Sequence, residues 1–215
     1  MPTFNDLQEH FTEQIRKGLE GSFFVKRYED ADTAIVALKD ATGLLAIPTG
    51  YTDVGVLTKD QGLTWTRDIS TNDTTSLGYA EPTRRDITSD VTGLQFTMQE
   101  SKRQAFELHE GLDLSAVEQD ANGNVYWDKP SRPASIFYRG LALFKDGDGA
   151  DALYFGKWLP RFQITDRREQ AWREEVEVQY GVTATAYVDQ AIGTAVRSLW
   201  AGPAAKLTQM GFSAA

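Results

Sequence analysis

Alternation of apolar and polar side chains is the clearest pattern in the chain, and it predicts paired β-strands. A turn at residues 60–62 precedes an alternating segment at residues 63–68, which we expect to be a strand. A longer alternation at residues 84–99 predicts a second strand with one face on a core. Its apolar face consists of Leu94, Phe96 and Met98, and its polar face consists of Gln95, Thr97 and Gln99.

Between these two strands, residues 68–76 are rich in Ser, Thr, Asn and Asp, whose side chains compete for backbone hydrogen bonds. We expect a loop or a tight corner there. After the second strand, Ser101 is placed to cap a short helix and Gly111 is placed to end it. His109, near the end of this helix, is interpreted as a favourable charge at the helix terminus.

The N-terminal pattern is different, because its apolar residues recur at every fourth position. Residues 6–20 are predicted to form an amphipathic helix, capped by Asn5 or Asp6 and ended by Gly18 or Gly21. Two interpretations stay open: the helix packs on its own domain, or its apolar stripe is an interface with a neighbouring subunit. The stripe consists of Leu7, Phe11, Ile15 and Leu19.

The rest of the N-terminal part is predicted to be extended. Residues 22–28 and 33–39 are rich in β-branched and aromatic residues, which favours two short strands. Pro48 and Gly50 then indicate an extended connection, since proline does not fit a central strand. We therefore expect residues 1–50 to form a helix and an extended arm.

Two hairpins are predicted further along the chain. The first turns at Asn122-Gly123, and the second joins residues 135–144 to residues 152–159. Both turns contain Asp or Asn residues, but neither has the Gly and Glu positions that a calcium-binding EF-hand loop needs. We expect ordinary turns and no metal site.

The longest alternation covers residues 174–188, with mostly valine and alanine on one face and charged or polar residues on the other. At about 3.3 Å per residue, such a strand would be on the order of 45 Å long. Its polar face begins with Glu175, Glu177 and Gln179. The last residues, 191–215, contain a short apolar run, a Gly-Pro break and a small-residue end, which predict a C-terminal arm.

Composition restricts the function more than the fold. The chain has 215 residues, no cysteine and a net charge of −9, so it cannot form disulfides or thiolate metal sites. The acidic balance disfavours a conventional nucleic-acid-binding role. The first residues lack the basic and apolar regions of a signal peptide, and no apolar run is long enough to span a bilayer. We expect a soluble protein made in the cytosol, with no membrane partner.

The sequence contains no motif for nucleophilic catalysis, phosphate loops, dinucleotide binding or zinc proteolysis. Carboxylates are plentiful, but nothing combines a nucleophile, a base and an electrostatic stabiliser. We expect no enzymatic activity and no cofactor. The tryptophans could form a sugar-stacking platform, although in a β protein they are more often core or interface residues. They are Trp65, Trp127, Trp158, Trp172 and Trp200.

Residues 50–111 resemble the major tail protein, or tail tube protein, of long-tailed siphophages, particularly those that infect actinobacteria. In that family a D-x-G-x-(V/L)-T-x-D-G-L-T pattern leads through a small polar loop to a strand with spaced Arg, Thr, Phe and Glu, and then to a short helix that ends near Gly. The matches to the first pattern are Asp53, Gly55, Thr58, Gly62, Leu63 and Thr64. The matches to the strand are Arg84 or Arg85, Thr88, Phe96 and Glu100. A later segment, VTATAYVD, is similar to the family's last core strand.

The resemblance implies a mainly β protein with a β-sandwich or small barrel at residues 51–190, flanked by a short helix and by terminal arms. It implies hexameric rings that stack into a hollow tail tube for genome ejection. The expected partners are further copies of the chain and other tail proteins, such as the tape measure and the tail terminator, with DNA as passing cargo.

An acidic wall would repel passing DNA, so the polar faces of the two longest strands are the predicted lumen surface. The predicted lumen residues are Glu175, Glu177 and Gln179, followed by Gln95, Thr97 and Gln99. The predicted subunit interface is the stripe of Leu7, Phe11, Ile15 and Leu19. Two other classes stay open: a monomeric β-sandwich that binds carbohydrate through its tryptophans, and an adhesin-like module of the virion.

Overall fold

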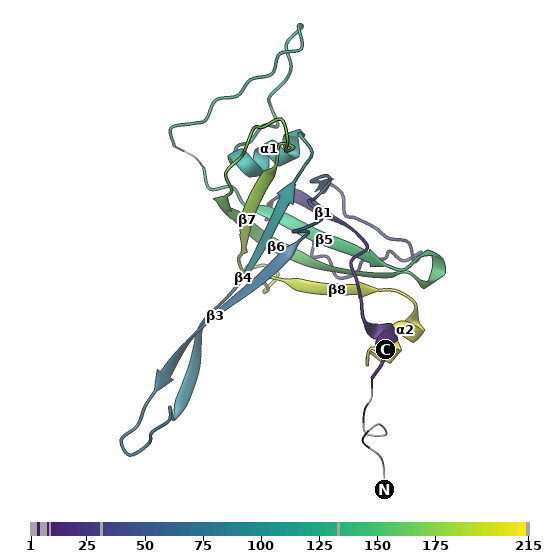
Figure 1. The fold of residues 1–215 in the computed structure, drawn as a ribbon, viewed down its shortest axis with the longest axis vertical. Helices are drawn as coiled ribbons and strands as arrows, with labels where there is room; N and C mark the ends of the chain where they lie inside the picture. The colour runs from purple at the N-terminus through teal and green to yellow at the C-terminus, as the bar shows by residue number, and fades with distance from the viewer. Residues whose placement is uncertain (1–3, 5–7, 9, 31, 133, 214–215) are drawn as a thin grey trace.

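A computed structural model describes residues 4, 8, 10–30, 32–132 and 134–213. These residues form one mainly antiparallel β structure with short helices at its periphery (Figure 1). The strands are β1 (Glu20–Arg27), β2 (Thr52–Asp53), β3 (Thr64–Thr74), β4 (Arg84–Met98), β5 (Tyr138–Asp146), β6 (Leu153–Arg167), β7 (Tyr180–Ala186) and β8 (Arg197–Ala201). The helices are η2 (Thr12–Gln14), α1 (Arg103–Glu110), η3 (Gly149–Asp151) and α2 (Ala204–Gln209).

Strand β6 is the centre of the sheet. The order of the described strands is β2-β1-β5-β6-β7-β4-β3, and β8 also pairs with β6. One edge of β6 pairs with β5, while its other edge pairs first with β8 and then with β7. Because β6 is 15 residues long, it can hold two partners in succession along one edge. The sheet therefore divides at β6 into two parts that fold over a common core.

Residues 52–58 link the two parts of the sheet. The Val54 amide donates to the carbonyl of Phe23 in β1 (2.9 Å), and the Thr58 amide donates to the carbonyl of Thr97 in β4 (3.0 Å). Leu57 also forms an isolated bridge with Met98. This short segment thus pairs with β1 in one part of the sheet and with β4 in the other. It gives the sandwich a barrel-like closure and removes exposed strand edges at this point.

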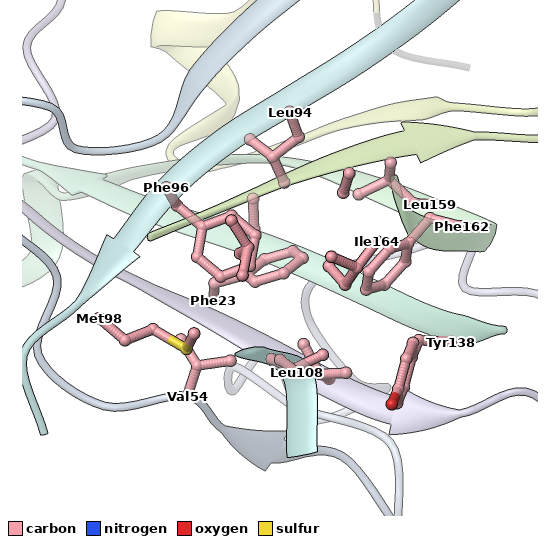
Figure 2. Packing of buried hydrophobic residues seen from close by; sticks show 14 of the residues in the cluster. Phe23, Val54, Leu94, Phe96, Met98, Leu108, Tyr138, Leu159, Phe162 and Ile164 are labelled. Carbon is pink, nitrogen blue, oxygen red and sulfur yellow. The ribbon is translucent and has the colours of Figure 1, made fainter. Parts of the chain in front are cut away.

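The main core lies between the two parts of the sheet, and α1 covers one end of it (Figure 2). The Phe23 ring in β1 contacts the Phe96 ring in β4 and the Phe162 ring in β6, with centroid distances of 5.0 and 5.9 Å. A second cluster lies on the other face of β5 and β6, under the connection from β1 to β2. Its buried members are Ile35, Leu38, Leu141, Trp158, Leu199 and Ala201.

The mainly β architecture with a short helix is confirmed. The predicted strands at residues 63–68 and 84–99 overlap β3 and β4, and the second predicted hairpin is formed by β5 and β6. Gly111 ends α1 in the left-handed region at φ 70°, where a residue without a Cβ is favoured. The predicted cap at Ser101 is wrong, since Lys102 is the N-cap and the Ser101 hydroxyl lies 2.8 Å from the Tyr180 hydroxyl.

The predicted helix at residues 6–20 is wrong over its described part. Only the single turn η2 is helical, and Ile15 already has an extended backbone. The Leu19 amide donates to the carbonyl of Lys145 (3.1 Å), which continues the pairing of β1 with β5. Gly18 lies against the Phe144 ring so closely that a Cβ there would be 2.5 Å from Cδ1. A short helix without a packing surface is marginal in water, whereas the extended chain finds a strand edge.

The loop predicted at residues 68–76 is wrong for residues 68–74, because Asp68–Thr74 continue β3 against β4, and only residues 75–76 lie outside the strand. A β-bulge between Ser70 and Thr71 interrupts the register once. The Asp73 carboxylate there does not compete with the ladder, because it accepts two hydrogen bonds from Arg85 on the opposite strand. The strand predicted at residues 33–39 is absent; this connection buries Ile35 and Leu38 without forming a regular strand.

The 45 Å strand predicted at residues 174–188 is wrong as well. Strand β7 begins only at Tyr180, and residues 174–179 are a turn and irregular chain. Tyr180 pairs with Met98, the last residue of β4, after which the chain turns into α1. The preceding residues therefore have no strand edge to join. Likewise, the Asn122-Gly123 turn is present but no strands flank it in the described chain, so the first predicted hairpin is wrong.

Candidate assembly surfaces

The face of β3, β4, β7 and β6 that points away from the main core is polar and rich in threonine. Strand register places its side chains in two rows. The first row is Thr64, Gln95, Thr183 and Asp166, and the second is Thr66, Gly93, Thr185 and Gln163. The side chains opposite this face enter the core, so the alternation of the four strands creates both surfaces. We call these eight residues the threonine face.

The predicted lumen residues of β4 lie on or near the threonine face, but two of them are covered by other side chains. The Gln95 side-chain oxygen accepts a hydrogen bond from Arg168 (3.2 Å). Thr97 is buried and its hydroxyl donates to the Gln61 side-chain oxygen (2.6 Å), which also accepts from Arg168 (2.9 Å). This face therefore has a covered end near Thr97 and a more open part at Thr183 and Thr185.

The predicted lumen residues before β7 lie in a loop beside the same end of the sheet. The Glu177 carboxylate accepts hydrogen bonds from the side chains of Gln99 (2.7 Å) and Gln179 (2.8 Å). The bond from Gln179, followed by the bond from Gln99, lowers the pKa of Glu177 below its ordinary value. Glu175 is exposed in the turn bounded by the bridge of Arg173 with Val176. The structure thus joins Gln99, Glu177 and Gln179 and leaves Glu175 apart.

The outer part of β3 and β4 projects away from the sandwich as a two-stranded hairpin (Figure 1). Within the described chain, Asp68–Thr74 and Arg84–Val91 pair only with each other, and both stretches are exposed throughout. We call residues 68–91 the outer hairpin and residues 75–83 its tip. Its exposed large apolar residues are Ile69, Leu77, Tyr79, Ile87 and Val91.

Ion pairs across the strands hold the outer hairpin together. The Arg67 guanidinium donates two hydrogen bonds to the Asp90 carboxylate, and Arg85 does the same to Asp73 at 2.7 and 2.8 Å. The bond from Arg67 lowers the pKa of Asp90, and the bond from Arg85 lowers the pKa of Asp73. A two-stranded ribbon without a core is only marginally stable. The two bidentate arginine–aspartate ion pairs therefore stabilise a hairpin that buries no apolar core of its own.

The predicted interface residues of the N-terminal segment are exposed where they are described. Phe11, Ile15 and Leu19 are each more than half exposed, although they lie on extended backbone and not on a helix. Leu7 lies outside the described residues. The Gln14 side chain donates to the carbonyl of Gln209 (2.6 Å), which places this segment beside α2.

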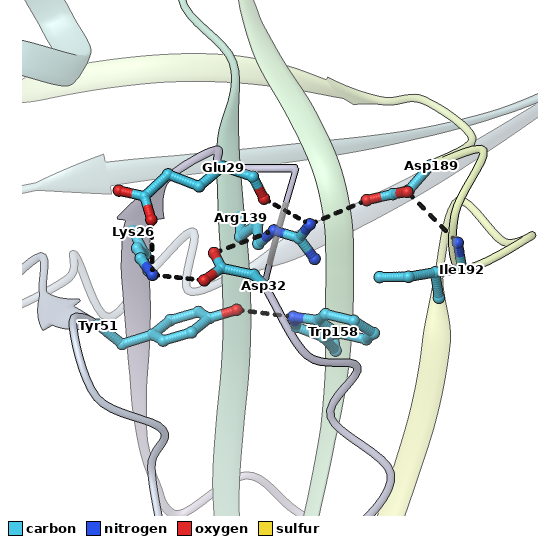
Figure 3. Close-up of polar contacts among 8 residues, drawn as sticks. All are labelled: Lys26, Glu29, Asp32, Tyr51, Arg139, Trp158, Asp189 and Ile192. Atoms are coloured by element: carbon cyan, nitrogen blue, oxygen red, sulfur yellow. Dashed lines mark hydrogen bonds and ion pairs between the residues drawn. The ribbon is translucent and has the colours of Figure 1, made fainter.

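A buried ion cluster ties two long connections to the sheet (Figure 3). Arg139 of β5 and Asp189, in the connection from β7 to β8, are each 1% exposed. Nη2 of Arg139 lies 3.1 Å from Oδ2 of Asp189 and donates to the carbonyl of Glu29 (2.9 Å). Its Nε lies 3.3 Å from Oδ2 of Asp32, whose other oxygen accepts from Lys26 (2.6 Å).

The same region is closed by a neutral hydrogen bond, from Trp158 Nε1 to the Tyr51 hydroxyl (2.9 Å). Asp189 in turn accepts hydrogen bonds from the amides of Ala191 and Ile192. One buried guanidinium thus fixes the connections after β1 and after β7 relative to β5. Since each charge in the cluster has a partner from a different segment, we interpret it as a structural anchor and not as a reactive site.

The described residues contain no cluster of three or more His, Asp or Glu side chains that could hold a metal ion. None of the described helices is long and apolar enough to cross a membrane. What stands out in the part of the chain that the structure covers is exposed apolar and polar surface: the outer hairpin, the N-terminal segment and the threonine face.

The sequence profile of the phage tail tube protein family matches residues 12–200. The chain belongs to the phage tail tube protein family. This tail tube protein is a structural component of the virion, in which such proteins assemble with one another and with other tail proteins into a tube. A comparison with curated proteins finds no match.

Sequence reasoning missed the outer hairpin of this tail tube protein, although a signal for it was present. Arginine and aspartate recur on both sides of the tip, and the antiparallel pairing brings Arg67 to Asp90 and Asp73 to Arg85. Complementary charges at mirrored distances from a Gly- and Pro-containing turn are typical of paired strands. The composition of residues 68–76 alone concealed this symmetry.

Proposed function

We propose that this tail tube protein closes into hexameric rings, which stack to form a conduit for genome ejection. The observation that carries the proposal is the outer hairpin. It exposes five large apolar side chains on a ribbon that has no core of its own. A monomer gains nothing from such a ribbon, whereas a second subunit can bury it. The sixfold number rests on the likeness to siphophage tail tube proteins described above.

Ring closure also accounts for the open edge of the sheet. Strand β3 is the last strand in the sheet order, so its outer edge is unpaired in the described chain. Exposed edges invite pairing with other chains, and a closed ring supplies that pairing in a controlled way. We place the exposed N-terminal residues Phe11, Ile15 and Leu19 in contacts with neighbouring subunits, as further apolar surface for the same assembly.

We assign the threonine face, with the neighbouring Gln99, Glu177 and Gln179, to the lumen. Hydroxyl and amide groups interact with phosphate far more weakly than lysine or arginine, and the net charge of −9 adds repulsion. DNA could therefore slide past without being held. The Arg168 side chain, which donates to Gln61 and Gln95, is the cation beside this face, and those bonds fix it against the wall.

In this proposal the protein is not an enzyme and is made in the host cytoplasm. The tape measure and tail terminator proteins are its neighbours along and at the end of the tube. Electron microscopy of the purified protein at high concentration tests the assembly. Rings or tubes with six subunits per turn are expected. Particles that remain monomeric at every concentration, although the protein is folded, contradict the proposal.

A further inference from the structure

An aromatic row crosses the sheet beyond the end of the main core. Phe144 of β5 pairs in register with Phe155 of β6, and Phe155 pairs with Trp200 of β8. The rings are stacked, with centroids 5.8 Å apart for the two phenylalanines and 5.2 Å apart for Phe155 and Trp200. On the other side Phe144 pairs with Gly21, where a Cβ would lie 2.3 Å from the Phe144 ring. Glycine at this position leaves room for the Phe144 ring.

This row is the floor of a cavity of about 420 Å³. The base of the outer hairpin forms the opposite wall, through Leu63 and Trp65. The charged residues of the described lining are both lysines, Lys59 and Lys157, and Nζ of Lys157 lies 4.6 Å from the centre of the Trp65 ring. We call this cavity the aromatic pocket. It is apolar, open at the surface and bordered by positive charge, so it fits an apolar segment that carries a carboxylate.

The hairpin tip is complementary to the aromatic pocket, because it combines exposed apolar side chains with a negative charge. Leu77 is fully exposed and Tyr79 is 71% exposed. The sequence of the tip is TSLGYAEPT, in which Glu81 is the single charged residue. Two large apolar side chains and one carboxylate thus lie within five residues, at the projecting end of the outer hairpin (Figure 1).

A tip cannot enter the pocket of its own subunit. The pocket wall at Trp65 is the base of the same hairpin, and the straight strand from Trp65 to Thr74 separates base and tip by roughly 30 Å at 3.3 Å per residue. A hairpin tip that fills the aromatic pocket must therefore belong to another subunit.

We infer that the hairpin tip of one subunit inserts Leu77 and Tyr79 into the aromatic pocket of a second subunit, with Glu81 facing Lys59 and Lys157. The inference rests on the proposed tube function and names the surface that joins its subunits. Because tip and pocket are different surfaces, the contact is head-to-tail. Repeating it from subunit to subunit leads to a ring or a filament.

Cross-linking between two single-cysteine variants tests the contact, since the chain has no cysteine of its own. Leu77→Cys places a thiol on the tip, and Ser198→Cys places one on the exposed border of the pocket. After the two variants are mixed and assembled, a short bismaleimide is added. We expect a covalent dimer of the two variants. The matched control replaces Leu77→Cys with Asn122→Cys, an exposed position on the tip of a different loop.

The outcomes separate this inference from the proposed function. Tubes with tip–pocket cross-links well above the control support both. Tubes without such cross-links overturn the inference and leave the tube function intact, whereas a folded protein that gives neither tubes nor cross-links contradicts both. If a glycan array shows carbohydrate binding that Trp200→Ala abolishes, the pocket is a sugar site and the inference is overturned.

A second variant pair checks the energetics of the contact. Leu77→Asp would bury a carboxylate in the aromatic pocket, so the protein concentration at which tubes form should rise at least about tenfold. Thr75→Asp adds the same charge to the same tip at a residue outside the inferred contact, and it should leave assembly nearly unchanged. Equal effects of the two substitutions would contradict insertion of Leu77.

Discussion

Two long hairpins of this protein have similar secondary structure and opposite surroundings. Strands β4 and β6 are each 15 residues long, and each is paired with a hairpin partner. Strand β6 is buried from Leu153 to Ile164 apart from a few half-buried positions, because clusters lie on both of its faces. Strand β4 is exposed from Arg84 to Val91 and becomes buried only where β7 joins it.

The comparison shows that a strand needs a pairing partner but not a core. In the β5–β6 hairpin, apolar burial and the Arg139 cluster supply the stability. In the outer hairpin, cross-strand pairs and two arginine–aspartate forks maintain the shape, and the apolar side chains remain available to another molecule. The first hairpin therefore specifies the monomer, and the second is suited to join monomers.

The largest expected effect is on the buried side of this comparison. Arg139→Ala removes the cation from the cluster and leaves Asp189 buried without its ionic partner. The free energy of unfolding should fall by about 3 to 5 kcal/mol, measured by denaturant unfolding. The double variant Arg139→Ala, Asp189→Ala should lose less than the sum of the single losses. Additive losses would mean that the two charges are not coupled.

A core substitution in β6 should have an effect of similar or slightly smaller size. Leu159 is fully buried, so Leu159→Ala should lower the free energy of unfolding by about 2 to 5 kcal/mol through lost contacts and a cavity. The same unfolding experiment measures it. A loss below about 1 kcal/mol would show that the core collapses around the gap, which would weaken the contrast with the outer hairpin.

The matched substitution in the outer hairpin should separate stability from assembly. Ile87 is exposed on β4, so Ile87→Ala should change the unfolding free energy of the monomer by no more than about 0.5 kcal/mol. Tube formation, followed by light scattering, should nevertheless require more protein. Val36→Ala, at an exposed residue outside the hairpin, serves as the control and should alter neither quantity. A large loss of monomer stability from Ile87→Ala would show that the outer hairpin stabilises the monomer as the β5–β6 hairpin does.

The smallest expected effect concerns the charge pairs of the outer hairpin. Hydrogen bonds from the arginines lower the pKa of Asp73 and Asp90 in the folded protein, so their stabilising contribution is present above the ordinary aspartate pKa of 3.8. It is lost as the pH falls through the lowered values. Carboxyl titration by NMR should therefore give midpoints below 3.8. Arg67→Gln should return the midpoint of Asp90, but not that of Asp73, towards the ordinary value.

The elements that sequence reasoning found have partners near in the chain or a complete apolar face. The alternation at Leu94, Phe96 and Met98 was sufficient to predict β4, and Gly111 was sufficient to predict the end of α1. In both places the local sequence pattern agrees with the burial in the structure. The β5–β6 hairpin followed from two apolar runs around a turn rich in glycine and aspartate. Membership of the tail tube protein family was also recognisable from residues 50–111.

Apart from the outer hairpin, which its polar composition concealed, the failures occurred where strand pairing depends on distant parts of the chain. Residues 174–179 alternate like a strand, but β4 ends at Met98 and supplies no edge to them. Residues 11–19 have the spacing of a helix, but Leu19 instead continues the pairing of β1 with β5. Periodicity predicts on which face of a helix or strand a side chain would lie. Whether a strand forms is decided by the presence of another strand edge with which it can pair. The aromatic pocket was hidden for the same reason, since its floor joins residues from three strands.

The distance in sequence between the outer hairpin and Trp200 has a consequence for the order of events during synthesis. Among the described strands β8 leaves the ribosome last, and it completes the aromatic row. The outer hairpin is finished more than a hundred residues earlier. A nascent chain thus carries the tip well before it has a complete pocket. Head-to-tail growth through the aromatic pocket must then wait until β8 has emerged, which keeps neighbouring chains on one messenger from polymerising prematurely.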